Sequence, residues 1–276
     1  MATEGIAKRL EEQTRKIKAW MGKIRHKIAV LSGKGGVGKS MLAVNIAACL
    51  AMDGRVGRVG ILDADITGPT IPKMLGVRGS SLVAGPPGIF PAVGPLGIKV
   101  VSMDFLLPSD ETPVIWRGPM KTMAIRQFLA DVVWGELDFL VVDLPPGTGD
   151  EALTVAQAIP GLDGSVVVTI PSEVSQLVVK KAVTFSKKLH VPVIGVVENM
   201  SRFVCPNCGA VVDLFGHGGG KKIAEDLGVK FLGSIPFDVR LRESCDRGVP
   251  FVVEYPDSPT TEAIRNVVSG ILGALE

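Results

Sequence analysis

The sequence predicts an α/β protein with a doubly wound, mostly parallel sheet. From residue 27 onward, apolar runs rich in Val, Ile and Leu alternate with patterns of helical periodicity. Nearly continuous apolar runs of this kind are typical of parallel strands buried on both faces. A Gly-rich loop joins the first apolar run to the first helical pattern. We therefore expect ligands at the carboxyl ends of the strands.

Residues 2–25 precede the first apolar run and form an amphipathic pattern. Apolar residues recur there, mostly three, four or seven positions apart among Lys, Arg and Glu, at Ile6, Leu10, Ile17, Trp20, Met21 and Ile24. That spacing predicts a helix with one apolar face, which we expect to pack on the main domain. We divide the chain into an N-terminal helix, 1–26, and a single domain, 27–276.

The remaining elements follow from the same alternation. Strands are predicted at 27–32, 58–63, 98–103, 138–143, 165–170, 192–197 and 230–234. Helices are predicted at 39–52, 119–132, 150–158, 173–189, 217–227 and 258–274. The segment Gly79–Pro95 is dense in Gly and Pro and predicts a surface loop or a short hairpin.

The composition narrows the class of protein. With 276 residues, 46% hydrophobic and 21% charged, the chain can bury a substantial core. A net charge of +2 does not indicate a nucleic-acid partner. The longest apolar stretches, such as 42–52, are too short to span a bilayer, and the N-terminus has no apolar signal core. We expect a cytoplasmic protein without membrane or nucleic-acid partners, whose four cysteines form no disulfide framework.

The loop Ser32–Ser40 contains the pattern G-x-x-x-x-G-K-[ST] between a strand and a helix. Its glycines let successive backbone N–H groups form an anion-binding nest, to which the helix dipole adds. Lys39 would reach the β- and γ-phosphates, and the Ser40 hydroxyl would bind Mg²⁺. The other loop positions are Gly33, Lys34, Gly35, Gly36, Val37 and Gly38. This pattern predicts a nucleotide site.

Carboxylates and an amide follow three other strands. Asp63 and Asp65 end one strand two residues apart and point the same way on an extended backbone. Asp143 follows four apolar residues, in the position of a Walker B carboxylate that holds Mg²⁺ directly or through water. The turn Pro145–Gly149 after it can bind a γ-phosphate and move when that group leaves. Asn199 can pair with the adenine edge, or be an ordinary turn residue.

Cys205-Pro206-Asn207-Cys208-Gly209 is a C-x₂-C knuckle whose two thiolates can face one metal. The chain has no second C-x₂-C, so a four-thiolate site needs the same pair from a second copy. The residues leave zinc, which the spacing favours, an iron–sulfur cluster, a redox pair and an unliganded turn open. Cys49 is predicted in the core; Cys245, near a helix end, is expected to be buried and structural.

Two stretches resemble a known family. The loop Gly33–Ser40, with the additional Lys34, looks like the deviant Walker A motif of the MinD/ParA class of P-loop ATPases. The stretch Trp134–Asp150 and the cysteine pair are similar to the Mrp/ApbC iron–sulfur cluster carriers within that class, and the resemblance covers about residues 27–272. Partitioning and division ATPases of the class lack the paired cysteines at this place.

The resemblance implies a P-loop NTPase fold and a homodimer in which Lys34 reaches the partner's nucleotide. Asp65 would then orient the attacking water, and Asp63 would lie in the Mg²⁺ shell or act as a structural cap. Asn199 would contact adenine, and Met41 would join the loop residues in the nucleotide site. Cys205 and Cys208 would share a [4Fe–4S] cluster with their counterparts in the partner.

These observations predict a homodimeric Mg·ATPase that carries a [4Fe–4S] cluster to apo-proteins, with slow, regulatory ATP hydrolysis. Two alternatives remain open. One is a MinD/ParA-like positioning switch, although the C-terminal residues 267–276 hold no Lys or Arg that would favour membrane docking. The other is an ATPase whose dimer is joined by a structural zinc at the cysteine pair.

Overall fold

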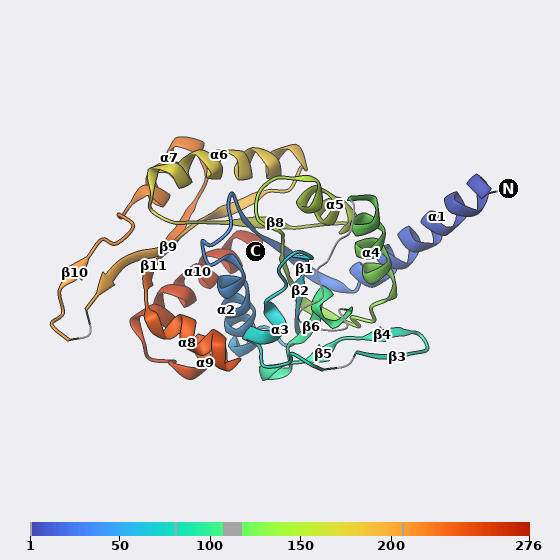
Figure 1. Cartoon of the computed structure of the whole chain (residues 1–276), viewed down its shortest axis with the longest axis horizontal. Helices are drawn as coiled ribbons and strands as arrows, with labels where there is room; N and C mark the ends of the chain where they lie inside the picture. Colours follow the sequence, from blue (N-terminus) through green and yellow to red (C-terminus); the bar gives the residue numbers. More distant parts are fainter. Residues whose placement is uncertain (1, 81, 107–117, 206) are drawn as a thin grey trace.

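The fold is a doubly wound α/β sandwich, as predicted. A computed structural model describes residues 2–80, 82–106, 118–205 and 207–276. In this part of the chain, the main sheet follows the order β10-β9-β8-β1-β7-β2-β6-β5, with β11 also paired to β9. The pairs among β1, β2, β6, β7, β8, β9 and β11 are parallel, whereas β5 and β10 pair antiparallel. Figure 1 shows this sheet through the centre of the molecule.

The bounds of the elements are as follows. The strands of the main sheet are β1 (Ile24–Ser32), β2 (Val59–Asp63), β5 (Ala92–Val93), β6 (Lys99–Ser102), β7 (Leu137–Asp143), β8 (Gly164–Thr169), β9 (Val193–Val204), β10 (Val211–Val212) and β11 (Phe231–Phe237). A separate hairpin consists of β3 (Val83–Gly85) and β4 (Gly88–Phe90). The α-helices are α1 (Ala2–Met21), α2 (Lys39–Met52), α3 (Ile71–Met74), α4 (Gly118–Asp131), α5 (Asp150–Ala158), α6 (Glu173–Lys188), α7 (Gly219–Leu227), α8 (Val239–Arg247), α9 (Phe251–Glu254) and α10 (Pro259–Leu275).

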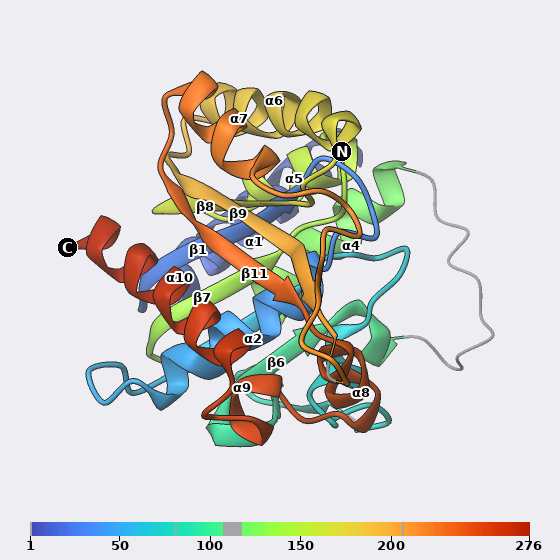
Figure 2. The same ribbon diagram turned by 90° about the vertical axis from the view of Figure 1, so that its left-hand side faces the viewer.

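Helices cover both faces of the sheet, which explains why the central strands are apolar throughout. In β1, Ile28 and Val30 pack into the layer beneath α2 and α10, while Ala29 and Leu31 face the opposite layer. Successive side chains of a strand point to opposite faces, so both faces need apolar residues. Figure 2 shows the sheet between α6 and α7 on one side and α2 and α10 on the other.

Helix α1 belongs to the second layer. Ile17 and Met21 are buried there, and the backbone of the chain passes directly into β1. Polar contacts join α1 to α4: Gln13 donates to Gln127, and Arg126 donates to Thr14 at 2.7 Å. The N-terminal part of α1 extends beyond the body of the molecule (Figure 1).

The predicted ends of several strands and helices were wrong, because the local pattern of apolar residues does not determine where an element begins or ends. β1 begins at Ile24 rather than at 27, and β9 continues from Val193 to Val204 although the apolar run predicts only 192–197. The extra length of β9 is stabilised by pairing with β10 and β11, which are distant or weakly apolar segments. Helices α3, α8 and α9 were not predicted, because they are short or strongly charged. In Gly79–Pro95, β3 and β4 form the short hairpin that was one of the two expectations.

Within the described residues, none of the helices combines the length and the apolar character needed to cross a membrane.

Candidate nucleotide and thiolate sites

Strands β1, β7 and β2, which are neighbours in the sheet, and strand β9 bring the polar residues of the nucleotide motifs to one edge of the sheet. β1 ends at Ser32, directly before the phosphate loop, and β7 ends at Asp143 in register with Val30 of β1. On the other side of β7, Asp63 at the end of β2 is the register partner of Asp143. Asn199 lies within β9, two strands from β1. These residues are far apart in the sequence and lie close together because of the order of their strands in the sheet.

The phosphate loop owes its path to two close approaches that exclude side chains. Gly38 has a left-handed backbone, φ 82°, and a Cβ there would collide with the amide nitrogen of Asn199. Gly33 lies against the backbone of Val178 in α6, where a Cβ would be 2.5 Å from the carbonyl oxygen. Glycine is thus favoured at Gly33 for steric reasons and at Gly38 for both steric and conformational reasons. Between them, Gly35 is exposed and Gly36 is left-handed.

Lys39 and Asp143 form a buried ion pair at the root of this loop. The Lys39 Nζ lies 2.5 Å from Asp143 Oδ1 and 3.2 Å from Ser40 Oγ. The second oxygen, Asp143 Oδ2, is buried and has no hydrogen-bond partner among the described residues. Burial raises the pKa of Asp143, and the Lys39 ammonium opposes this rise. A buried carboxylate oxygen beside a hydroxyl suits a hard cation such as Mg²⁺, which Ser40 and Asp143 could hold.

Asp63 serves as the anchor of the segment that follows β2. Its Oδ2 accepts hydrogen bonds from the N–H groups of Thr70 (3.0 Å) and Ile71 (3.1 Å) and from Ser102 Oγ (3.1 Å). Burial and then the nearby Asp143 raise the pKa of Asp63 to about 7. These bonds are those of a structural cap, the second of the two roles that the sequence left open.

Asp65 lies two residues further on and is half-buried. Its Oδ1 accepts from the backbone N–H groups of Thr67 (3.2 Å) and Gly68 (3.1 Å), and its own N–H donates to Asp63 Oδ1 at 3.3 Å. Asp65 is therefore held at the edge of the site by a short turn, while its other carboxylate oxygen takes no part in that turn. The structure brings it beside Asp63 and Asp143, as expected from the strand ends.

The turn Pro145–Gly149 is tied to the phosphate loop by its backbone. Gly147 N–H donates to the carbonyl of Ser32 at 2.9 Å, with a left-handed φ of 86° at Gly147. Thr148, the next residue, is exposed. The turn thus connects the end of β7 and the start of α5 to the loop that follows β1.

Asn199 contacts the phosphate loop and lines a cavity beside it. Its Nδ2 donates to the carbonyl of Val37 at 2.8 Å, and its buried Oδ1 has no partner within the described part of the chain. The cavity, about 420 Å³, is mostly apolar and open at one side. It is lined by Gly38, Met41, Met74, Asn199, Met200, Pro236, Phe237, Asp238, Val239, Leu241, Arg242, Cys245 and Asp246. An adenine ring fits this chemistry, since Asn199 Oδ1 can accept from its exocyclic amine.

The sequence did not indicate the far wall of this cavity, which comes from β11 and α8. Leu241 and Cys245 of α8 face it. Burial raises the pKa of the Cys245 thiol to about 11, so Cys245 is a half-buried, neutral wall residue. Asp238 caps α8 and holds Arg240 in a two-bond ion pair, with a shorter distance of 2.7 Å. The only available signal was the apolar alternation of Leu241 with charged neighbours.

Lys34 stands apart from the other loop residues. It is half-buried, and no described residue forms an ion pair with its ammonium group. Ser32 Oγ instead donates to the Lys34 carbonyl at 2.9 Å, which fixes the backbone of the loop but not the side chain. The Lys34 ammonium therefore has no ion-pair partner in the part of the chain that the structure describes.

Cys205 and Cys208 lie in the turn between β9 and β10. Cys205 N–H donates to the Ala210 carbonyl, and Gly209 N–H donates to the Cys205 carbonyl, both at 2.9 Å. The N–H groups of Asn207 and Cys208, followed by the Cys208 thiol, hold the pKa of Cys205 below its usual value. Pro206, between the thiols, lies outside the described residues. The described chain contains no group of three or more His, Cys, Asp or Glu that could hold a metal.

A second feature that the sequence did not reveal connects the two sites along β9. Glu198 is buried and accepts hydrogen bonds from Gly220 N–H (2.6 Å), Ser201 Oγ (2.8 Å) and Gly218 N–H (3.1 Å). It therefore holds the start of α7, which follows the cysteine turn, against the strand that carries Asn199. Directly after Asn199, the backbone of Met200 is left-handed, φ 55°. His217 bonds Asp213 at 2.7 Å.

The sequence of the chain matches known proteins over most of its length. Residues 23–272 match the sequence profile of a ParA-type family described as NUBPL iron-transfer P-loop NTPases. The chain is 56% identical over 269 residues to an iron-sulfur cluster carrier protein of Methanocaldococcus jannaschii, covering 98% of this chain and 91% of the relative. An iron-sulfur cluster carrier protein of Saccharolobus solfataricus is 54% identical over 261 residues, with 95% and 88% covered.

Solved structures show the same relationship. A nucleotide-binding protein of Archaeoglobus fulgidus, solved with ADP, has a TM-score of 0.75 and 42% identity, covering 85% of this chain and 91% of its own. The cell division ATPase MinD of Pyrococcus furiosus has a TM-score of 0.66 at 19% identity, covering 90% and 99%, which shows a shared fold alone. The P-loop NTPase fold predicted from the loop and the resemblance drawn from Lys34, Trp134–Asp150 and the cysteines are both confirmed.

Proposed function

Because this chain belongs to the family of NUBPL iron-transfer P-loop NTPases, we propose that it is a homodimeric Mg·ATPase that carries a [4Fe–4S] cluster and passes it to apo-proteins. ATP hydrolysis in this proposal is slow and regulates cluster transfer. The protein acts in the cytoplasm, and nucleic acids and membranes are not its partners.

The nucleotide part of the proposal rests on the phosphate loop and on two buried acceptors, Asp143 Oδ2 and Asn199 Oδ1, that accept no hydrogen bond from a described residue. Ser40 and Asp143 would hold Mg²⁺, which neutralises phosphate charge when bound. Lys39 would bind the phosphates and Asn199 the base, with Met41 against the ring. Asp65 would orient the water, while Asp63, by its hydrogen bonds, secures the segment that positions Asp65.

The cargo part rests on the cysteine turn. Two thiols, one of them with a lowered pKa, provide half of the four thiolates that a [4Fe–4S] cluster takes. A second copy related by a two-fold axis would provide the others. The surface around the turn is apolar and exposed, with Val204, Val211, Val212 and Leu214 each 43–60% accessible. Such a patch is suited to burial against another chain.

A dimer would also give Lys34 a role. Its ammonium forms no ion pair with the described residues of its own copy, and the phosphates of a nucleotide in the facing copy would provide a partner. Formation of one homodimer would thus give Lys34 a phosphate partner and would also complete the four-thiolate site at Cys205 and Cys208. The observation that carries the proposal is that β9 bears Asn199 at the nucleotide cavity and continues to Cys205 at the cargo site.

The decisive experiment compares metal content after anaerobic purification and reconstitution with iron and sulfide. We expect about four iron and four sulfide per dimer, a broad visible absorption band, and transfer of the cluster to an apo-ferredoxin. Cys205→Ser should lose the band and keep nucleotide affinity, whereas Cys49→Ser should keep both. Stoichiometric zinc that iron and sulfide do not replace would instead establish the structural-zinc alternative and reject the carrier function.

A further inference from the structure

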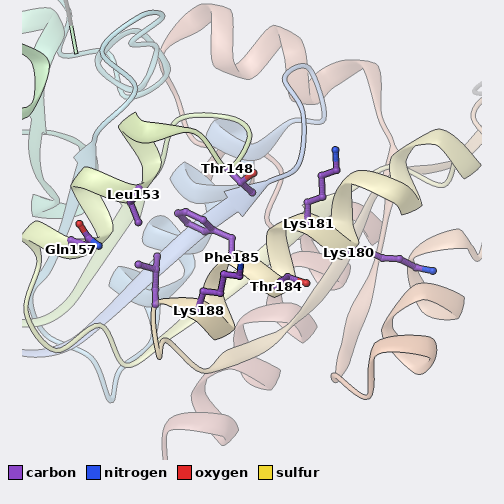
Figure 3. Close-up of a pocket in the computed structure, with 9 residues that line it drawn as sticks. Thr148, Leu153, Gln157, Lys180, Lys181, Thr184, Phe185 and Lys188 are labelled. Atoms are coloured by element: carbon purple, nitrogen blue, oxygen red, sulfur yellow. The ribbon is translucent and has the colours of Figure 1, made fainter. Parts of the chain in front are cut away.

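A groove that the nucleotide and thiolate sites do not use lies between α5 and α6. Its volume is about 520 Å³. The lining residues come from the two helices and from the turn before α5: Thr148, Leu153, Gln157, Lys180, Lys181, Thr184, Phe185, Lys188 and Leu189. Figure 3 shows the Phe185 ring pointing toward Leu153 across the space between the helices.

The groove has an apolar floor and a basic rim. Leu153, Phe185 and Leu189 are half-buried and form the floor. Lys180, Lys181 and Lys188 are exposed, and none of the three forms an ion pair with a described residue. The carboxylates of α5, Asp150 and Glu151, stand in its first turn and do not line the groove. The rim therefore carries three positive charges that no described carboxylate pairs with directly.

This combination distinguishes between kinds of ligand. A small anion needs fixed donors, but the donors here are long, mobile side chains around a floor of hydrocarbon. Nucleic acid would meet exposed aromatic platforms or an extended basic face, whereas Phe185 is the one aromatic residue of the lining and lies in the floor. An acidic peptide with a large apolar residue satisfies both parts, with its side chain on the floor and its carboxylates at the rim.

We propose that the groove between α5 and α6 docks an acidic segment of another protein through one large apolar anchor residue. The volume accommodates one aromatic side chain and the few residues beside it. Thr148 places one end of the groove at the turn whose Gly147 bonds Ser32, so the docked segment contacts the turn that follows Asp143. The docking does not depend on the proposed cargo or on hydrolysis.

The test uses the full-length protein and a fluorescein-labelled synthetic peptide in which Glu and Asp flank a single Phe. Fluorescence anisotropy should report saturable binding that weakens as salt is raised from 50 to 300 mM, because exposed charges are screened. The variant Lys180→Glu/Lys181→Glu/Lys188→Glu should lose at least about tenfold in affinity. The matched variant Lys187→Glu/Lys221→Glu/Lys222→Glu makes the same charge change outside the groove and should bind as the unaltered protein does.

A second peptide with Ser in place of Phe tests the floor, and should bind roughly tenfold more weakly, as expected for a lost apolar anchor. Equal binding of the two peptides would overturn the proposal, as would equal losses in the two lysine variants. Competition by inorganic phosphate or by single-stranded DNA at matched charge would likewise overturn it. If the Glu variant fails to fold, judged by thermal unfolding, Lys→Gln changes at the same three positions provide the same comparison.

Discussion

The ammonium of Lys39 lies 2.5 Å from Asp143 Oδ1, while Asp143 Oδ2 is buried without a hydrogen-bond partner in the described part of the chain. The two residues are 104 positions apart and meet because β1 and β7 are parallel neighbours. A buried charge pair contributes little net stability, but removal of one partner leaves an uncompensated charge. The stability of the folded protein and the proposed binding of the nucleotide therefore depend on the same two side chains, Lys39 and Asp143.

We predict that Lys39→Met destabilises the nucleotide-free protein by roughly 3–5 kcal/mol, because it leaves the Asp143 carboxylate buried alone. The double variant Lys39→Met/Asp143→Leu should recover much of that loss, since both charges are gone. Urea unfolding measures the free energies of the three proteins. Both variants should lose ATP affinity, and a single variant as stable as the unaltered protein would contradict the importance of the pair.

For Lys34 we predict a separation of turnover from binding. Lys34→Ala should retain ATP affinity within about threefold, because its ammonium forms no ion pair with a described residue of its own copy, but should reduce hydrolysis by tenfold or more, as expected for a lost charge at the transferring phosphate. Steady-state turnover and nucleotide titration distinguish the two quantities. Lys187→Ala, an exposed lysine on α6, provides the control. Equal losses in affinity and turnover would argue against a contribution from the partner copy.

Asn199 should determine the preference for adenine. Asn199→Ala removes the donor to the Val37 carbonyl and the free Oδ1 acceptor, so we expect ATP binding to weaken by roughly 1–3 kcal/mol. GTP binding, which does not use the adenine amine, should change less, and the ratio of the two affinities should fall. Isothermal titration with both nucleotides measures this ratio, with Asn207→Ala as the control. An unchanged ratio would remove Asn199 from base recognition.

Cys205 should respond to pH differently from Cys49 and Cys245 in the metal-free protein. Alkylation requires the thiolate, and burial raises the pKa values of Cys49 and Cys245 to about 11. These two thiols should remain unmodified by iodoacetamide at pH 7 and react only as the pH approaches that value. The pKa of Cys205 is lowered, so its reaction should begin below the pH at which a free cysteine reacts. Time-resolved mass spectrometry of tryptic peptides reports each site, and Cys245 reacting as fast as Cys205 would contradict the assignment.

Much of the nucleotide site could be predicted from the sequence, because its residues follow the ends of predicted strands. Lys39, Asp143 and Asn199 each follow a recognisable apolar run, and carboxyl ends of parallel strands meet at one edge of a sheet. The sequence therefore indicated the edge and the residues together. It also predicted that Cys205 and Cys208 alone cannot complete a four-thiolate site, because the chain has no second C-x₂-C pair.

The remaining features depend on contacts between distant segments. The wall formed by Leu241 and Cys245 requires α8, which is short and strongly charged and so carries a weak local signal. The hydrogen bonds of Glu198 join a strand to a Gly-rich turn some 20 residues later, a pairing that no periodicity encodes. The choice of Asp63 as a cap likewise becomes visible only when Thr70, Ile71 and Ser102 are seen around its carboxylate.

Met200 has a left-handed backbone and lies in β9 between Asn199 and the residues that lead to Cys205. A non-Gly residue in this conformation is strained by about 1–2 kcal/mol, and here the bonds of Glu198 and Ser201 hold it in place. Met200 also lines the cavity beside Asn199, so the same residue borders the proposed base site and begins the outer part of β9. Beyond it, Ser201, Phe203 and Val204 are paired to β10 or β11, and five residues of extended chain span roughly 17 Å to Cys205. A single paired strand therefore joins the residue beside the proposed base site to the first of the two thiols.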